Sequence, residues 1–157
     1  MNLSEQEFEK KYYMYKDTIY NIAFTYVHNE SDASDIIQDV FMKYLKSNKS
    51  FPSNDDEKYW LIRVTINTCL SFIKSSWKKK VELVEEIDLG GAYTQENFIY
   101  YEAITTLPEI YKEVLILHYY ENFKIEEISK ILKTNNNVIK KRLQRAKLML
   151  KEKIQEN

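Results

Sequence analysis

Glycine and proline are scarce in this chain, with two of each among 157 residues, and this scarcity limits the folds open to it. Turn-rich sheet folds consume both residue types, because tight turns need the positive φ of glycine or the fixed φ of proline. Apolar residues recur instead at steps of three or four along most of the sequence, as they do on one face of a helix. The sequence therefore predicts an all-α fold of long helices with short connections.

Three helices are expected in the first half, over residues 4–27, 32–46 and 56–78. Ser4 and Glu7 have the spacing of a capping box, which marks the start of the first helix. The second helix has an apolar side that we expect to face inward, made of Ala33, Ile36, Ile37, Val40, Tyr44 and Leu45. Its opposite side carries Asp35, Gln38, Asp39 and Met42.

The third helix carries a second, polar stripe beside its apolar one. This stripe comprises Arg63, Asn67, Ser71, Lys74 and Lys78 and contains no acid. A polar helix face is ordinarily just solvated, but a face with Arg, Asn and Lys and no acid can also follow a nucleic-acid backbone. Both interpretations stay open at this point.

An acid-rich segment separates the two halves of the chain. Residues 80–98 contain both glycines, and the seven acids between residues 81 and 111 are accompanied by no Lys or Arg. We interpret residues 80–98 as a flexible acidic linker between a domain of residues 1–79 and a domain of residues 99–157.

The second domain is expected to start near Phe98 and to contain a helix that begins near residue 107. Thr106 and Glu109 have capping-box spacing, with Pro108 in the first turn, where a missing N–H costs nothing. The apolar positions expected to line this helix are Ile110, Val114 and Leu117, with Tyr111 and His118 as further candidates.

The last two predicted helices, residues 125–132 and a helix from about residue 137, are joined by a turn of about four residues, the pattern of a helix-turn-helix. Asn135 or Asn136 suits the N-cap of the second helix. Ile139, Leu143, Ala146 and Leu150 form one narrow apolar stripe on it. The fold class predicted is thus all-α, with two small helical domains and a helix-turn-helix in the second.

The same helix is strongly basic, since residues 133–153 hold eight Lys or Arg and one Glu although the whole chain has a formal charge of −1. With the apolar stripe committed to the core, Lys140, Lys141 and Gln144 must point outward, where they can reach base edges in a DNA major groove. Arg142 and Arg145 flank that face and suit phosphates.

Other classes of protein fit the sequence poorly. No apolar run approaches the roughly 20 residues that a membrane span needs, and the N-terminus has no signal-peptide pattern. The single Cys cannot form an internal disulfide and fits a reducing cytosol. We predict no metal site, no cofactor and no catalytic residues, because no ligand cluster, phosphate-binding loop or nucleophile–base set is visible.

Three blocks of sequence, in order and covering most of the chain, resemble the extracytoplasmic-function sigma factors, a subfamily of bacterial RNA polymerase sigma factors. The first is "DASDIIQDVFMKYL" (32–45), similar to an A-x-D-x-x-Q-[DE]-x-F pattern, and the second is "YWLIRVTIN" (59–67), similar to W-L-x-R-I-A-x-N. The third runs from "LPEIYKEVLILHYYENF" through "IEEISKIL" to "VIKKRLQRAKLML" (107–150) and is similar to L-P-x-x-x-R-x-V, E-I-A and V-K-x-R-L-x-R-A.

The resemblance implies a cytoplasmic, non-enzymatic specificity subunit that binds core RNA polymerase and directs it to promoters. It implies that the clamp helices of the largest subunit bind Asp35, Gln38, Asp39 and Met42. It implies that the melted −10 strand binds Asn48, Phe51, Arg63, Asn67, Lys74 and Lys78. It implies that the −35 duplex binds Asn136, Asn137, Lys140, Lys141, Arg142, Gln144 and Arg145, while the second domain docks on the flap of the second-largest subunit.

An anti-sigma factor is a further partner that the resemblance allows. The chain departs from the family pattern at Asn137 and Val138, which stand where Gly-Thr is common, and at Ser129, which replaces the Ala of E-I-A. The alternative interpretation is a stand-alone helix-turn-helix regulator whose first domain binds an effector or a second copy of itself.

Overall fold

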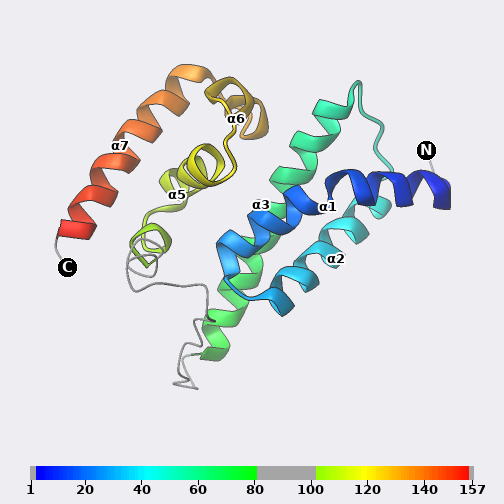
Figure 1. The fold of residues 1–157 in the computed structure, drawn as a ribbon, viewed down its shortest axis with the longest axis horizontal. Helices are drawn as coiled ribbons and strands as arrows, with labels where there is room; N and C mark the ends of the chain where they lie inside the picture. Colours follow the sequence, from blue (N-terminus) through cyan, green and yellow to red (C-terminus); the bar gives the residue numbers. More distant parts are fainter. Residues whose placement is uncertain (1–2, 81–101, 156–157) are drawn as a thin grey trace. The chain divides into compact units, whose positions relative to one another are not determined.

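The computed structural model describes residues 3–80 and 102–155, and the side chains of residues 76–80 lie outside what it describes (Figure 1). The elements are α1 (Glu5–Val27), α2 (Glu30–Ser47), α3 (Asn54–Lys80), α5 (Glu109–Leu115), the π-helix η1 (Ile116–Tyr120), α6 (Ile125–Ile131) and α7 (Asn136–Gln155). Residues 102–105 are also helical, and no strand occurs in the described ranges. The all-α prediction is therefore confirmed.

The chain divides into two compact units. The first holds α1, α2 and almost all of α3, and the second holds α5, η1, most of α6 and α7. Except for Lys80, the predicted acidic linker lies outside the described residues, so its flexibility stays a prediction.

Side-chain caps fix the starts of the three helices in the first unit. Ser4 Oγ accepts a hydrogen bond from the Glu7 N–H at 3.1 Å, as the capping-box pattern predicts. Asn29 Oδ1 accepts from the Asp32 N–H at 2.9 Å, and Ser53 Oγ accepts from the Asp56 N–H at 3.1 Å. These caps start α2 and α3 two residues before the positions expected from the apolar pattern.

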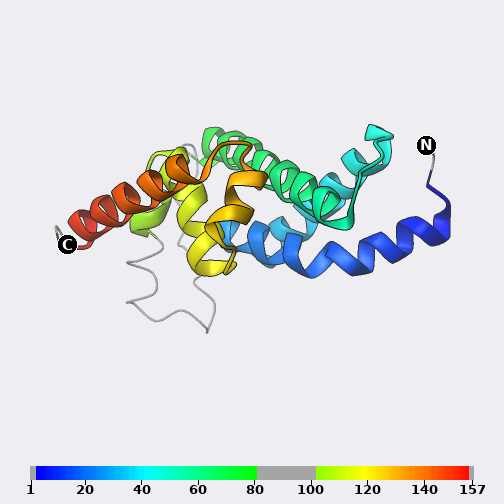
Figure 2. The same cartoon turned by 90° about the horizontal axis from the view of Figure 1, so that it is seen from above.

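The core of the first unit is formed by side chains from all three helices. α1 and α2 lie side by side (Figures 1 and 2), and the ring centroids of Tyr12 and Phe41 are 4.8 Å apart between them. The largest fully buried side chains are Ile19, Ile22, Ile36, Leu61, Ile62 and Ile66. Cys69 is also fully buried, which agrees with a packing role for it.

One buried carboxylate ties the first turn of α3 to both neighbouring helices. Glu57 is 7% exposed; its Oε1 accepts from the Tyr15 hydroxyl at 3.0 Å and its Oε2 from the Tyr44 hydroxyl at 2.7 Å. Lys11 Nζ lies 2.9 Å from Oε1 and supplies the opposite charge. Burial and the Glu57 carboxylate both raise the pKa of Tyr15 and Tyr44, so the two hydroxyls remain donors.

Leu45 corrects the predicted inward face of α2, because it is 43% exposed. Its spacing explains this position: Leu45 follows Met42 by three residues and Gln38 by seven, so it continues the outward stripe. The other five predicted inward positions of α2 are buried.

In the second unit, α5 passes directly into the π-helix η1, where the Glu121 N–H donates to the Ile116 carbonyl at 3.1 Å. α5 packs against α7, and the buried side chains include Val114, Leu117, Ile128, Ile139, Leu143 and Ala146. His118, one of the two further candidates for lining this helix, is half-buried and its Nδ1 lies 3.0 Å from the Phe123 carbonyl oxygen.

Two sequence predictions for the start of α5 are wrong. Pro108 is the N-cap of α5 and no side chain caps the helix, so Thr106 and Glu109 form no capping box. The Thr106 hydroxyl donates instead to the Ala103 carbonyl at 2.9 Å and accepts from Lys153 Nζ at 2.8 Å. Ile110 is 46% exposed, because it lies in the first turn of α5, and the buried positions of this helix begin further along it.

Candidate nucleic-acid interface

The turn between α6 and α7 is closed by local hydrogen bonds. The Thr134 N–H donates to the Ser129 carbonyl at 2.9 Å, and Lys133 adopts a left-handed φ of 54° to make this possible. Asn135 Oδ1 then accepts from the Val138 N–H at 3.0 Å. Of the two N-cap candidates, the structure therefore selects Asn135, and α7 begins at Asn136.

Helix α7 has a clear inner and outer side. Ile139, Leu143 and Ala146 are buried, as the apolar stripe predicts, and Leu150 is half-buried. The positions predicted to face DNA are exposed at Asn136, Asn137, Lys140, Lys141, Gln144 and Arg145, and half-buried at Arg142. The helix has no acid in its first turn. Its free N–H groups and dipole therefore add to the positive charge of its outer side.

A second cationic face runs along α3. Asn67, Ser71 and Lys74 are exposed on it, and Arg63 is half-buried. Arg63 Nη1 is buried and has no hydrogen-bond partner among the described residues. Lys78 lies in α3, but its side chain is outside the described part.

The loop that leads into α3 supplies the two remaining predicted contacts to DNA. Asn48 is exposed and ends α2 with a left-handed φ of 53°. Phe51 is half-buried, and its ring centroid lies 5.5 Å from that of Trp60. Trp60 is itself half-buried, so it is not fully part of the core.

The outward stripe of α2 has a mixed acidic and apolar character. Asp35, Gln38, Asp39 and Met42 are all exposed, Met42 by 49%. The Asp39 carboxylate lies 3.5 Å from Lys43 Nζ, an exposed pair that contributes little to stability and that a partner can compete with. Leu45 extends the stripe. Sequence reasoning missed it, although its spacing of three from Met42 was visible.

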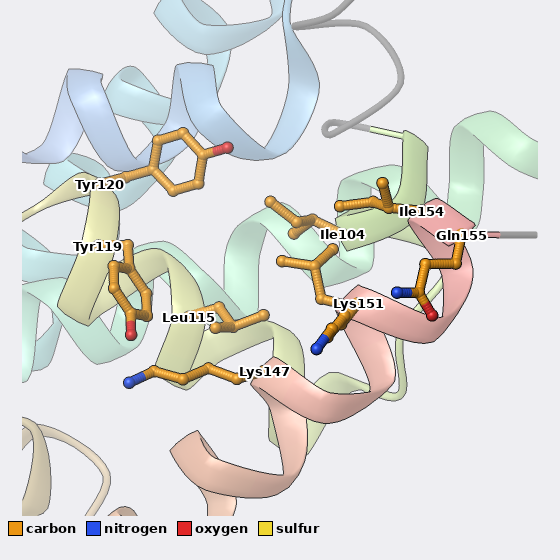
Figure 3. A pocket seen from close by; sticks show the side chains of 9 residues that line it. Ile104, Leu115, Tyr119, Tyr120, Lys147, Lys151, Ile154 and Gln155 are labelled. Atoms are coloured by element: carbon orange, nitrogen blue, oxygen red, sulfur yellow. The ribbon is translucent and has the colours of Figure 1, made fainter. Parts of the chain in front are cut away.

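The second unit also contains an apolar groove of about 470 Å³ that the sequence did not reveal (Figure 3). Ile104, Leu115, Leu150 and Ile154 supply its apolar lining, and Tyr119, Tyr120, Lys147, Lys151 and Gln155 complete it. Lys147 Nζ lies 5.3 Å from the centroid of the Tyr119 ring. The groove joins residues up to 51 positions apart, from Ile104 to Gln155, which explains why no local pattern predicts it.

Within residues 3–80 and 102–155, no helix combines the length and the apolar character that a membrane span requires. Within the same ranges, no group of three or more His, Cys, Asp or Glu side chains is arranged to hold a metal ion.

Comparison with known proteins gives matches over both units. The profile of sigma-70 region 2 matches residues 12–79, and that of sigma-70 region 4 matches residues 98–150. RNA polymerase sigma factor SigV of Bacillus subtilis is 34% identical over 139 residues, which are 86% of this chain and 84% of that protein. The ECF RNA polymerase sigma factor SigW of Bacillus subtilis is 26% identical, over 91% of this chain and 86% of that protein.

Solved structures share the fold. The sigma factor RpoE of Bartonella quintana, in complex with the anti-sigma factor NepR, matches with a TM-score of 0.68 and 20% identity, over 96% of this chain and 98% of that chain. CnrH, in complex with the cytosolic domain of CnrY, matches with a TM-score of 0.70 and 15% identity, over 98% of this chain and 91% of that chain.

Proposed function

The chain belongs to the extracytoplasmic-function subfamily of sigma factors and serves promoter-directed transcription initiation, and we propose how its exposed faces divide that work. The proposal depends mainly on the outer side of α7. Lys140, Lys141 and Gln144 are exposed there, and a hydrogen bond from the Val138 N–H to Asn135 fixes the start of the helix.

The outer side of α7 reads the −35 element as duplex DNA. Lys140 and Lys141 donate to guanine or phosphate, and Gln144 can pair with adenine through both its donor and its acceptor. Arg142, Arg145 and the first residues of α7, Asn136 and Asn137, hold the adjacent phosphates.

The cationic face of α3 holds the melted −10 strand. Asn67 and Lys74 are exposed to it, Lys78 extends the line, and the half-buried Arg63 adds a further positive charge. Asn48 and Phe51 in the preceding loop contact the unpaired bases. Strand binding of this kind stabilises the open promoter, and this contributes to melting.

Core polymerase binds two further surfaces. The stripe of Asp35, Gln38, Asp39 and Met42 docks on the clamp helices of the largest subunit, where its carboxylates pair with basic residues. The apolar groove of the second unit, with Lys147 and Lys151 beside it, suits the flap of the second-largest subunit. The domain limits of 1–79 and 99–157 follow this division.

The protein contributes no catalysis of its own and acts in the cytoplasm as a dissociable subunit of the polymerase. Because the two similar solved structures are complexes with the anti-sigma factor NepR and with the cytosolic domain of CnrY, we include an anti-sigma factor among the partners of this chain.

The −35 assignment is tested by transcription from a series of promoters with altered −35 elements. Lys141→Ala and Gln144→Ala should each weaken use of the wild-type element by about 5- to 150-fold, since one good base contact contributes about 1–3 kcal/mol. Lys124→Ala, an exposed lysine of the same unit, is the control and should change nothing. A promoter series that responds equally to all three variants would remove the assignment.

The docking assignment is tested by capture of core polymerase. Asp39→Lys reverses the charge at the centre of the α2 stripe and should abolish capture while leaving helix content unchanged. Asp17→Lys makes the same change at an exposed position of α1 and should not. Equal capture by both variants would exclude the α2 stripe as the docking surface.

A further inference from the structure

One polar network joins the two ends of the loop that is proposed above to contact the unpaired bases. Residues 48–53 connect α2, which ends at Ser47, to α3, which begins at Asn54, and they include Asn48 and Phe51. All of these loop residues except Phe51 are exposed. Little packing therefore holds the loop itself, and its conformation depends on how its two ends are fixed.

The two ends are joined by the buried carboxylate of Glu57. Tyr44, in the last turn of α2, donates its hydroxyl to Glu57 Oε2 at 2.7 Å, across 13 residues of chain. The Glu57 N–H donates to the Ser53 carbonyl at 3.2 Å, so the same residue also binds the last residue of the loop. At the other end, Ser47 Oγ donates to the Tyr44 carbonyl at 2.8 Å. A link at the base of a loop reduces the conformations that are open to it.

Helix α1 holds the first residue of α3 from a third side. Tyr15 Oη lies 3.0 Å from Glu57 Oε1 and 3.1 Å from the Asn54 carbonyl oxygen. Lys11 Nζ lies 2.9 Å from the same Oε1 and donates to Asn54 Oδ1 at 3.1 Å. Lys11 and Tyr15 are four residues apart and therefore lie on one face of α1. All three helices of the first unit thus meet at the base of the loop.

The chemistry of this network suits positioning better than it suits stability alone. Glu57 is 7% exposed, so its charge has lost most of its hydration, and an apolar side chain would fill the same space without that penalty. Apolar packing, however, has little directional preference, whereas a carboxylate fixes the distance and angle of each hydroxyl that donates to it. The network therefore sets where α2 ends relative to the start of α3, which is the span that the loop must close.

We propose that Glu57 and Tyr44 are positioning residues for the loop of residues 48–53, which they hold in the conformation that receives the unpaired bases. This inference rests on the proposed role of Asn48 and Phe51, and it assigns no DNA contact to Glu57 or Tyr44. A loop that is already ordered has less conformational entropy to lose on binding. Without the link, the melted strand must order the loop itself and therefore binds more weakly.

The test uses holoenzyme assembled from core polymerase and the full chain, with a fork-junction DNA that has a duplex −35 element and a single-stranded −10 segment. Tyr44→Phe removes one hydroxyl and keeps both the ring and the pair of Glu57 with Lys11. It should weaken binding of the fork about 5- to 30-fold, which corresponds to about 1–2 kcal/mol, the cost of ordering the backbone of one residue. Binding of a duplex that contains the −35 element alone should not change.

A chain that lacks both proposed loop contacts shows whether Tyr44 acts through the loop. Asn48→Gly accepts the left-handed φ of 53° and removes the side-chain amide, and Phe51→Ala removes the ring. In a chain with both changes, adding Tyr44→Phe should alter fork binding by less than about twofold, because the contacts that the loop would position are absent. A general loss of stability would not depend on Asn48 and Phe51 in this way.

Ile22→Ala is the control for stability. Ile22 is fully buried in α1 and lies outside the network, so its truncation destabilises the same unit and leaves Glu57 and Tyr44 in place. At a temperature at which both variants are folded, Ile22→Ala should bind the fork as tightly as the wild type. Glu57→Gln disturbs the same bonds as Tyr44→Phe, so it should also weaken fork binding and should depend on the two loop contacts likewise.

Three outcomes would overturn the inference: fork binding that Tyr44→Phe does not weaken, a loss of equal size in the chain without the loop contacts, or an equal loss in Ile22→Ala. A chain with Asn48→Gly and Phe51→Ala that binds the fork as tightly as the wild type would instead refute the proposed role of the loop itself.

Discussion

Replacing Glu57 should destabilise the first unit more than replacing any exposed residue, because this buried carboxylate accepts from three donors. Tyr44 donates to it at 2.7 Å, Tyr15 at 3.0 Å, and Lys11 approaches at 2.9 Å. Hydrogen bonds to a charged group contribute about 1.5–3 kcal/mol each, and a buried donor left without an acceptor costs about 1–3 kcal/mol. Removing the carboxylate also removes the desolvation penalty of its buried charge, which offsets part of this loss. We therefore expect Glu57→Ala to lower the free energy of unfolding by about 3–4 kcal/mol.

Glu57→Gln should cost less, about 1–2 kcal/mol, because the amide keeps one carbonyl oxygen and its NH₂ can donate to a hydroxyl. Tyr15 also has a second acceptor, the Asn54 carbonyl at 3.1 Å, so its hydroxyl need not be left unpaired. Lys11 loses its charged partner in both variants. The expected order of stability is therefore Glu57→Ala lowest, Glu57→Gln intermediate and the wild type highest. This order is specific to a hydrogen-bonded carboxylate.

Urea unfolding followed by tryptophan fluorescence measures this effect in the intact chain. The chain has two tryptophans, Trp60 and Trp77, and both belong to the first unit, so the signal reports that unit. Asp55→Ala, an exposed carboxylate of the same helical turn, is the matched control and should cost about 0.5 kcal/mol. A loss below about 1 kcal/mol for Glu57→Ala would refute the reasoning.

The remaining predictions concern single positions at helix ends. Burial lowers the pKa of His28 to about 4, whereas the unfolded chain binds that proton below about pH 6.5. The first unit should therefore lose stability as pH falls from 6.5 to 4. In His28→Asn, the urea midpoint should depend less on pH across that range. Asparagine is the chosen replacement because it tolerates the left-handed φ of 49° at this position. Asn135→Ala should remove the cap of α7 and cost the second unit about 1 kcal/mol, seen as about fivefold faster amide exchange in α7; unchanged exchange would contradict the cap. Lys133→Gly should slow the same exchange, because glycine accepts the φ of 54° without strain, and faster exchange would show that the turn differs.

The helix-turn-helix could be predicted because its signals are local. Asn135 and Asn136 marked the start of the second helix, although the sequence did not decide between them, and the spacing of Ile139, Leu143 and Ala146 gave the buried side. Once these two facts are known, the outward direction of Lys140 follows from helix geometry alone. The same reasoning gave the outward direction of Asp35 and Gln38 in α2.

Prediction failed where a second element decides the outcome. Thr106 has the right spacing for a cap, yet its hydroxyl bonds to Ala103 and Lys153, and Lys153 is 47 residues away. The Glu57 network and the apolar groove likewise depend on side chains from distant helices. No periodicity within one segment contains that information, since periodicity describes which side is buried and not what it meets.

The central claim, that this chain brings core RNA polymerase to promoters by holding unpaired and duplex DNA on separate faces, is tested most directly by reconstituted transcription. Core polymerase, promoter DNA and nucleotides should give a specific run-off transcript only when the chain is added. The chain alone should leave duplex promoter DNA unprotected at the same concentration. Tight protection of duplex DNA by the chain alone, with no transcript from the mixture, would contradict the claim and favour a stand-alone regulator.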